Sequence, residues 1–333
     1  MLIKLTNPEQ VDKRKLKLES IFKSQLFSLY KTIANDHKKI IKQYGTIINK
    51  DLFIQEHSAN VKAILKTIYR KTFKEFGFDL RTAINQLTQN IEFDVKKSNQ
   101  NDIYDDYNEQ SLKLINTQAD DHTDFIMDTL YAKSLFYFDK ANNNYNNDII
   151  KLNNDIQKIT NSIQLLSKKP DNRINKLKLQ KLQKLLDQTK DKLNSALYDK
   201  NNYIANEFED LFNDNVSQQL ANIEAASEVG FAESTSRQLE LSLLATSGIT
   251  LTAQKKTIDF ATAFVKEWSA TLDNKTRTTH AHAHGQQKKY NERFEVANPR
   301  SGIIEYGLTP RDENFSLENK INCRCIMVVS MQF

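Results

Sequence analysis

Three of the six histidines, His280, His282 and His284, lie within five residues of one another, and the only two cysteines, Cys323 and Cys325, are one residue apart. Imidazole nitrogen and thiolate sulfur are the ligands that suit Zn²⁺. On an extended strand a Cys-x-Cys pair points both thiols to the same face; His280 and His282 would share a face of a strand, and His280 and His284 one face of a helix. The five residues are therefore candidates for a zinc site.

A second interpretation stays open because the spacing differs from that of common zinc fingers. In it the cysteines are ordinary buried or edge-strand residues, and the histidines form hydrogen bonds from a polar loop. A disulfide between Cys323 and Cys325 would be strained. The same groups could also serve a metal-dependent hydrolase or nuclease, but the sequence shows no obvious general base and no carboxylate cluster of the two-metal kind. We therefore expect no enzymatic activity, and no cofactor other than zinc.

Further polar and turn-forming residues surround these ligands in a defined order. They are Trp268, Asp273, Thr276, Arg277, His280, Gly285, Phe294, Pro310, Asp312, Asn322, Cys323, Arg324 and Cys325. The set resembles the C-terminal domain of the phage Mu protein F-like family, the minor head or head-morphogenesis proteins of tailed phages. The family pattern has a Trp, Asp-x-x-Thr-Arg-x-x-His, a Gly five residues after that His, a Phe, Pro-x-Asp and a terminal Asn-Cys-Arg-Cys.

The resemblance covers roughly residues 230–330 and departs from the family at two points. His284 stands where the family usually has Asn or Asp, and Arg237 and Glu240 match an upstream Arg-Thr-Glu with different spacing. The resemblance implies a minor capsid protein in the virion, at the portal vertex or the capsid interior, that assists head assembly, DNA packaging or ejection. The implied partners are the portal, scaffold or major capsid protein, with non-specific contact to phage DNA as a further alternative and no membrane partner.

The arginines of this region have two interpretations. Arg277 and Arg324 could pair with Asp273, Asp312 or a phosphate group, since the planar guanidinium suits all of these. We expect the internal Asp–Arg pairs.

The composition favours a mainly α-helical protein. The chain has 333 residues with only 7 Gly and 4 Pro, where typical usage would give about 23 and 17. Gly-rich nucleotide-binding folds and β-propellers need more turns than that. The net charge of +5 carries no specific message about nucleic acid. We expect no signal peptide and no membrane span, because no apolar run approaches the required length.

Apolar spacing predicts the arrangement of the helices. Residues 1–140 read as a helical domain with a polar loop at 98–110. Residues 141–205 read as a long antiparallel coiled-coil hairpin, because two apolar stripes flank a turn at 168–172. The first stripe comprises Ile149, Leu152, Ile156, Ile159, Ile163 and Leu166, and the second Leu179, Leu182, Leu186, Leu193 and Leu197, with polar Thr189 at one expected position.

The last third of the chain predicts a different architecture. Residues 206–229 read as a connecting helix or linker, and residues 230–333 as a small α+β domain, because five of the seven glycines lie from Gly230 onward. The apolar end of the chain, 325–329, reads as a buried strand. We expect Arg277, His280, Asn322, Cys323 and Cys325 to converge in space in this domain.

Overall fold

The computed structural model describes residues 2–77, 79–88, 100–170, 172–247, 250–253 and 256–332. The helices are α1 (Pro8–Tyr44), α2 (Lys50–Phe76), α3 (Asp79–Thr88), α4 (Gln100–Ser167), α5 (Arg173–Tyr198), α6 (Lys200–Phe212), α7 (Gln218–Thr246), α8 (Phe260–Ala263), α9 (Thr278–Ala283) and α10 (Leu317–Lys320), with a π-helical turn at Asn213–Ser217. The strands are β1 (Leu2–Lys4), β2 (Thr250–Ala253), β3 (Lys256–Asp259), β4 (Phe264–Ser269), β5 (Gln287–Lys289), β6 (Phe294–Ala297), β7 (Ile304–Gly307) and β8 (Ile326–Gln332).

The chain forms two compact units. One contains Met1–Phe27, Ser58–Phe125 and Gln219–Phe333, and the other contains Ser28–His57 and Ile126–Gln218. The first unit holds all the strands, and the second holds α5 and α6. The predicted fold class, mainly α with a helical hairpin and a small α+β region, is confirmed.

Three predicted segment limits differ from the structure. The expected loop at 98–110 is helical from Gln100, while residues 98 and 99 lie outside the described part. Within it Asp105, Asp106, Asn108, Glu109 and Gln110 are exposed, whereas Tyr107 is buried. Neither residue 140 nor residue 229 ends an element, because α4 and α7 run through them, and 206–229 is helical throughout.

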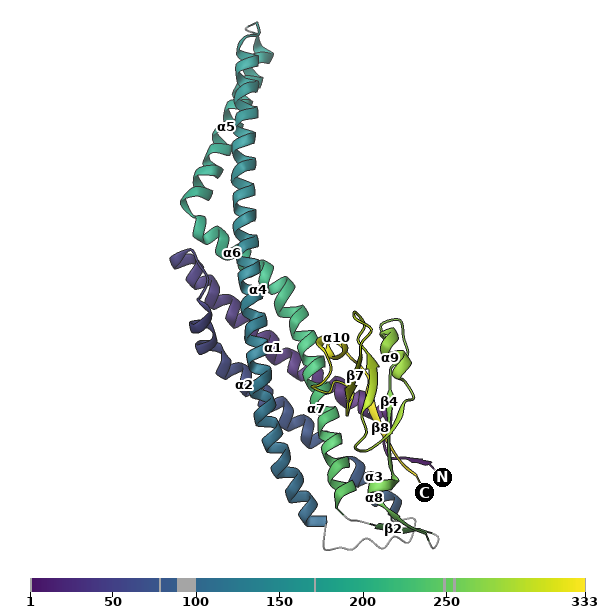
Figure 1. Ribbon diagram of the computed structural model, residues 1–333. Coiled ribbons are helices and arrows are strands. Elements are labelled where there is room, and N and C mark those ends of the chain that lie inside the picture. Colours follow the sequence, from purple (N-terminus) through teal and green to yellow (C-terminus); the bar gives the residue numbers. More distant parts are fainter. Residues whose placement is uncertain are drawn as a thin grey trace. The chain divides into compact units, whose positions relative to one another are not determined.

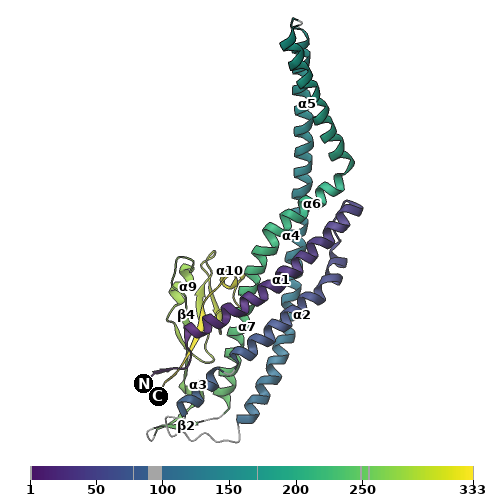
Figure 2. The same cartoon turned by 180° about the vertical axis from the view of Figure 1, so that it is seen from behind.

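The helical hairpin lies in the second unit. Figures 1 and 2 show α5 running back along the end of α4. Asn172 caps α5 by accepting a hydrogen bond from the Asn175 amide, as expected for an N-cap. In the seam of α5, Leu186 and Thr189 are buried, whereas Leu197 is 53% exposed. The predicted apolar stripe of α5 is therefore confirmed except at its last position. Polar Thr189 can lie in the seam because its hydroxyl donates a hydrogen bond to the Leu185 carbonyl.

The central sheet has four antiparallel strands in the order β1-β8-β4-β5. The predicted C-terminal strand, β8, lies between β1 and β4 and is buried along all but its last residue. Six residue pairs fix the register with β4, from Phe264 opposite Met331 to Ser269 opposite Ile326. Two further pairs of strands, β2–β3 and β6–β7, form separate two-stranded sheets.

The N-terminus belongs to this sheet, although residues 1–140 were expected to be helical only. In β1, Leu2 pairs with Gln332 and Lys4 with Ser330, so the two ends of the chain lie side by side (Figures 1 and 2). The strand is three residues long, too short for its alternation to stand out in the sequence.

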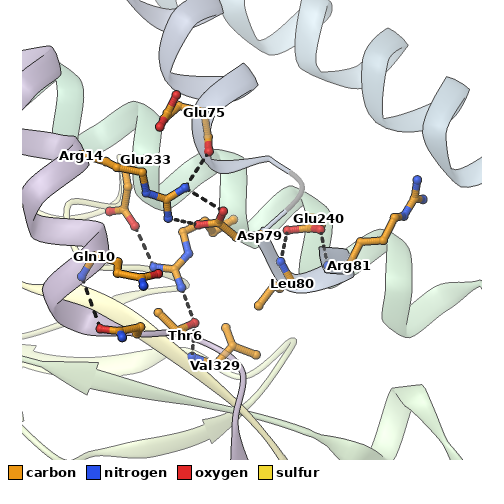
Figure 3. A network of polar contacts seen from close by, with 12 residues as sticks. Thr6, Gln10, Arg14, Glu75, Asp79, Leu80, Arg81, Glu233, Glu240 and Val329 are labelled. Atoms are coloured by element: carbon orange, nitrogen blue, oxygen red, sulfur yellow. Dashed lines mark hydrogen bonds and ion pairs between the residues drawn. The ribbon is translucent and has the colours of Figure 1, made fainter. Parts of the chain in front are cut away.

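Buried charges on α7 tie it to β1 and to α3. Arg237 forms an ion pair with Glu233 at 2.9 Å, and both side chains are fully buried. A second nitrogen of Arg237 donates to the Thr6 hydroxyl, which also accepts from the Val329 amide. Glu240 accepts hydrogen bonds from the Leu80 and Arg81 amides at the start of α3, as Figure 3 shows. These contacts give the polar residues of α7 partners from two other parts of the chain, Thr6 and the start of α3.

Gly230 lies within α7 and forms no turn, contrary to its interpretation as a sign of the domain boundary. A Cβ at position 230 would overlap the guanidinium of Arg311. Arg311 is itself buried and has a left-handed backbone conformation, with φ 67°. The glycine is therefore required by the close approach of a buried arginine to the helix.

The hairpin seam can be tested with two adjacent leucines of α5. Leu186 is 7% exposed and Leu185 is 47% exposed. We expect Leu186→Ala to destabilise the hairpin by about 2–3 kcal/mol because it opens a cavity, and Leu185→Ala to change it by less than about 0.5 kcal/mol. Amide hydrogen exchange of residues 173–198 in the full chain measures both. Equal effects of the two variants would contradict this seam.

Candidate functional site

One imidazole and the two thiols form a compact group. The ligand atoms of His280, Cys323 and Cys325 all lie within 4.8 Å of one another, and the three residues are buried. The Cys325 sulfur is 3.4 Å from Nδ1 of His280. A tetrahedral zinc ion with bonds of about 2.0–2.3 Å holds its ligand atoms about 3.3–3.8 Å apart. The group is therefore close to the geometry that a zinc ion requires.

The pairing of β4 with β8 places these residues together. The ladder ends at Ser269 and Ile326, so the chain that leaves β4 and the chain that enters β8 start from adjacent positions. The first leads to α9, which carries His280; the second contains both cysteines. Arg277 joins the two segments by donating a hydrogen bond to the Ile321 carbonyl.

The turn before the cysteines depends on Asn322. Its φ is 53°, in the left-handed region that Asn tolerates better than most residues. The Cys323 amide then donates to the Lys320 carbonyl at 3.2 Å. The turn directs the two thiols toward α9.

The hydrogen bonds of Asn319 determine which nitrogen of His280 is free. Nδ2 of Asn319 contacts two acceptors, the Glu305 carboxylate at 2.9 Å and the Ala297 carbonyl at 3.3 Å. Oδ1 of Asn319 therefore faces Nε2 of His280, at 3.2 Å, and can only accept. The proton of the neutral imidazole must then be on Nε2, which leaves the Nδ1 lone pair directed at the thiols. A metal-binding histidine commonly has this arrangement.

Glu305 anchors Asn319 through a small network of its own. Its carboxylate accepts from the side chains of Asn298 and Asn319 and from the Ser316 amide, each at 2.9 Å. Burial alone would raise the pKa of Glu305, but these hydrogen bonds lower it overall. The ionised carboxylate fixes the Asn319 amide, which in turn fixes the orientation of the imidazole.

Aromatic rings surround the group. The Trp268 ring contacts the rings of His280, Phe294 and Phe315 edge to face, with centroids 5.6, 5.6 and 5.9 Å apart. Both cysteines belong to the same buried cluster. The rings exclude water from one side of the thiols, so polar interactions there are stronger than at the surface.

The two thiols titrate as a coupled pair. A hydrogen bond from Cys325, together with the charge of Arg311, lowers the pKa of Cys323 well below the ordinary thiol value. The thiolate of Cys323 in turn raises the pKa of Cys325, as does burial. The pair therefore loses its first proton readily and holds its second, until a cation binds both sulfurs.

A cavity of about 10 Å³ adjoins the group, roughly the space of one water molecule. It is lined by Thr271, Lys275, Thr276, Arg277, His280, Asn322, Cys323, Arg324 and Cys325. No carboxylate is among these described lining residues. The space suits a small fourth ligand better than a substrate.

The structure brings together one of the three candidate histidines. His282 and His284 are exposed, and Nδ1 of His284 accepts a hydrogen bond from the Ala270 amide. Arg277, His280, Asn322, Cys323 and Cys325, by contrast, line one cavity, as expected.

The remaining residues of the motif have structural contacts. Arg324 forms an ion pair with Asp273, one of the internal pairs that were expected, and its hydrogen bond is the main reason that the pKa of Asp273 is lowered. Gly285 has a φ of 79° at the turn after α9. Asp312 accepts from the Leu308 amide at 2.7 Å and does not pair with Arg277 or Arg324 in the described contacts. Pro310 is buried beside it.

Arg237 and Glu240 lie elsewhere, on α7, where Arg237 pairs with Glu233 and Glu240 accepts from the Leu80 amide. Three residues near the site had no signal in the sequence: Asn319, Glu305 and Arg311. All three come from the stretch between Phe294 and Asn322, where only turn-forming residues were noted. Asn319 lies on the short helix α10, four residues before Cys323. A polar residue on so short a helix does not indicate a functional site by itself.

No protein-family model, no curated protein and no solved structure matches the chain. No helix in the described ranges has the length and apolar character that a bilayer crossing requires.

The tautomer of His280 is directly testable by ¹⁵N NMR of the reduced full-length protein near pH 8. We expect the proton on Nε2, with Nδ1 unprotonated, while exposed His282 shows both tautomers. Asn319→Leu should abolish the preference and lower stability by about 1–3 kcal/mol, because Glu305 and the imidazole lose a buried partner. A proton on Nδ1 of His280 in the unmodified chain would contradict the assignment.

Proposed function

We propose that this protein is a minor capsid or head-morphogenesis protein of a tailed phage, acting in the virion at the portal vertex or the capsid interior. The observation that supports this most is the convergence of the motif. Trp268, Arg277 and His280 are separated from Asn322 and Cys325 by about forty residues, yet they surround a single group. The residues of this ordered motif lie together in space, as the parts of one structural unit do. Residues of a chance sequence match would not need to be neighbours in the fold.

The proposal includes the partners that the resemblance implies. The portal protein is the first of them, followed by the scaffold and major capsid proteins, and the role is to assist head assembly, DNA packaging or ejection. A protein of this kind needs stable domains and binding surfaces rather than a substrate pocket. The small cavity beside the thiols is consistent with such a structural role.

The proposal also assigns zinc to the group of His280, Cys323 and Cys325. The donors would be Nδ1 and the two thiolates, with a water or another small ligand in the fourth position. Asn319 orients the imidazole, and the charge of Arg311 helps to lower the pKa of Cys323, so deprotonation of that thiol for binding is favoured. When bound, the ion clamps the segment after β4 to the segment before β8, and a small domain gains stability from such a clamp.

The hydrolase alternative is supported less well. A zinc-bound water acts as a nucleophile when a nearby base removes its proton. The described lining of the cavity offers Lys275, Arg277 and Arg324 close to that position, and no carboxylate. These positive side chains cannot accept the proton of a zinc-bound water, and their charge disfavours a protonated base beside them. A structural ion is the better account of these residues.

Zinc binding has a direct test. Full-length protein purified in reducing buffer should contain one zinc per chain by mass spectrometry of the metal. Cys323→Ser with Cys325→Ser should abolish binding and lower the Tm of the C-terminal region by about 5 °C or more, since about 1 kcal/mol shifts a domain of this size by 4–8 °C. A strong chelator should reproduce the loss.

His282→Ala is the matched control, because it removes a nearby histidine outside the group. It should keep both the zinc and the Tm. Full-length protein that binds no zinc when the metal is supplied, or that keeps its zinc in the double Cys variant, would contradict the assignment.

The role in the capsid is tested by co-expression with the portal, scaffold and major capsid proteins encoded in the same genome. We expect the chain to be retained by the purified portal or by assembled heads at a low, fixed ratio. The double Cys variant should lose retention in proportion to its loss of folded C-terminal domain. A chain that is absent from purified virions and free of all three partners is the result that contradicts the proposal.

A further inference from the structure

The helical hairpin contains one of two strongly basic stretches of the chain; the other is residues 1–50, with a net charge of +7. Residues 168–192 contain nine Lys or Arg and three Asp, a net charge of +6, while the whole chain carries +5. The other residues together are therefore slightly negative. The small net charge of the whole chain therefore does not reveal how basic residues 168–192 are. A local basic segment favours polyanionic partners, whereas a net charge of +5 alone does not.

This segment, residues 168–192, is the turn of the helical hairpin and about the first three quarters of α5 (Figure 1). We refer to it as the basic tip. Its positive residues are all exposed: Lys168, Lys169, Arg173, Lys176, Lys178, Lys181, Lys184, Lys190 and Lys192. On the other helix of the hairpin, residues 148–167 carry Lys151 and Lys158 against Asp148 and Asp155, so they are neutral overall.

Three lysines of the basic tip lie close together on α5, where Asp187 is the nearest acidic residue along the helix. Lys178, Lys181 and Lys184 are three residues apart on one helix, and they have no ion-pair partner among the described residues. Like charges at this spacing repel each other by a few tenths of a kcal/mol per pair. An external polyanion would remove this repulsion and release its own counterions on binding.

The spacing fits a nucleic acid duplex. From Lys178 to Lys184 the helix rises about 9 Å, and duplex DNA presents about five phosphate charges over that length. The hairpin buries the apolar face of α5 in its seam, where Leu179 and Leu182 lie with Leu186. That face is consequently not free to enter a bilayer, as an interfacial helix would require. Exposed Ile174 and Leu177 are flanked by Arg173, Lys176 and Lys178.

We propose that the basic tip binds the phosphate backbone of duplex DNA without sequence preference. The inference rests on the distribution of charge over the hairpin and does not depend on the role in the capsid. The contacts are electrostatic, from lysines and an arginine to phosphates, so they fix position along the duplex rather than read bases.

The experiment measures fluorescence anisotropy of a labelled 30-base-pair duplex of arbitrary sequence with the full-length protein between 50 and 200 mM salt. One variant replaces Lys178, Lys181 and Lys184 by Gln, which keeps helix propensity and folding. The matched control replaces Lys17, Lys113 and Lys133 by Gln, three exposed lysines outside the hairpin. Both variants remove three positive charges. A difference in DNA affinity between them therefore reports the location of the charges and not the net charge.

We expect the tip variant to bind at least tenfold more weakly at 100 mM salt. The slope of log K against log salt should fall by about 2–3, because each phosphate that is no longer neutralised lowers it by about 0.9. The control should stay within twofold of the unmodified chain. Circular dichroism of both variants should match the unmodified protein.

Three results would overturn the inference. The unmodified chain could fail to bind the duplex at 50 mM salt, or both variants could lose affinity equally, which would mean a diffuse charge effect. Lysine-dependent binding to vesicles with 30% phosphatidylserine, without binding to DNA, would identify a membrane surface instead. Retention by portal or heads is measured separately, so the failure of either proposal is recognised independently of the other.

Discussion

The antiparallel pairing of β4 with β8 is the constraint on which the C-terminal structure depends. Its register runs from Phe264 opposite Met331 to Ser269 opposite Ile326, and so places the chain after β4 beside the chain before β8. A slip of one residue would turn every side chain to the other face, which would remove Trp268 from the cysteines. On its other edge β8 pairs with β1, whose neighbour Thr6 receives a hydrogen bond from Arg237 of α7. β8 thus connects the ligand group, the N-terminal strand β1 and, through Thr6, the helix α7.

Buried charges reinforce this arrangement. Glu233 and Arg237 are paired with both side chains fully buried, and Glu240 caps α3. Arg311 approaches α7 so closely that only Gly230 can face it, and its three guanidinium nitrogens have no hydrogen-bond partner among the described residues. Its positive charge instead contributes to the lowered pKa of Cys323. An arginine buried without a partner is destabilising, and the negative charge of the Cys323 thiolate offsets part of that cost. The polar core and the ligand group are therefore connected through Arg311.

Local pattern was enough to predict the helices, the hairpin and the last strand, because periodic apolar residues and a capped turn act over a few residues. The convergence of His280 with the cysteines could also be predicted, from turns and a resemblance rather than from periodicity. Three kinds of feature could not. The three-residue strand β1 is too short to show a period, and Gly230 looks like a turn because its partner, Arg311, is distant in sequence. His282 does not share the helix face of His280, and α9 ends at Ala283, before His284. Asn319 and Glu305 become informative only when β6, β7 and α10 are folded around them.

The central claim is that His280, Cys323 and Cys325 form one metal-binding group oriented by Asn319. Zinc K-edge X-ray absorption of the full-length protein tests it most directly, because the technique identifies the atoms bound to the ion. The account predicts two sulfur atoms at about 2.3 Å and two nitrogen or oxygen atoms at about 2.0–2.1 Å. The sulfur signal should vanish in the double Cys→Ser variant and persist in His282→Ala. A bound ion surrounded only by nitrogen and oxygen would contradict the account.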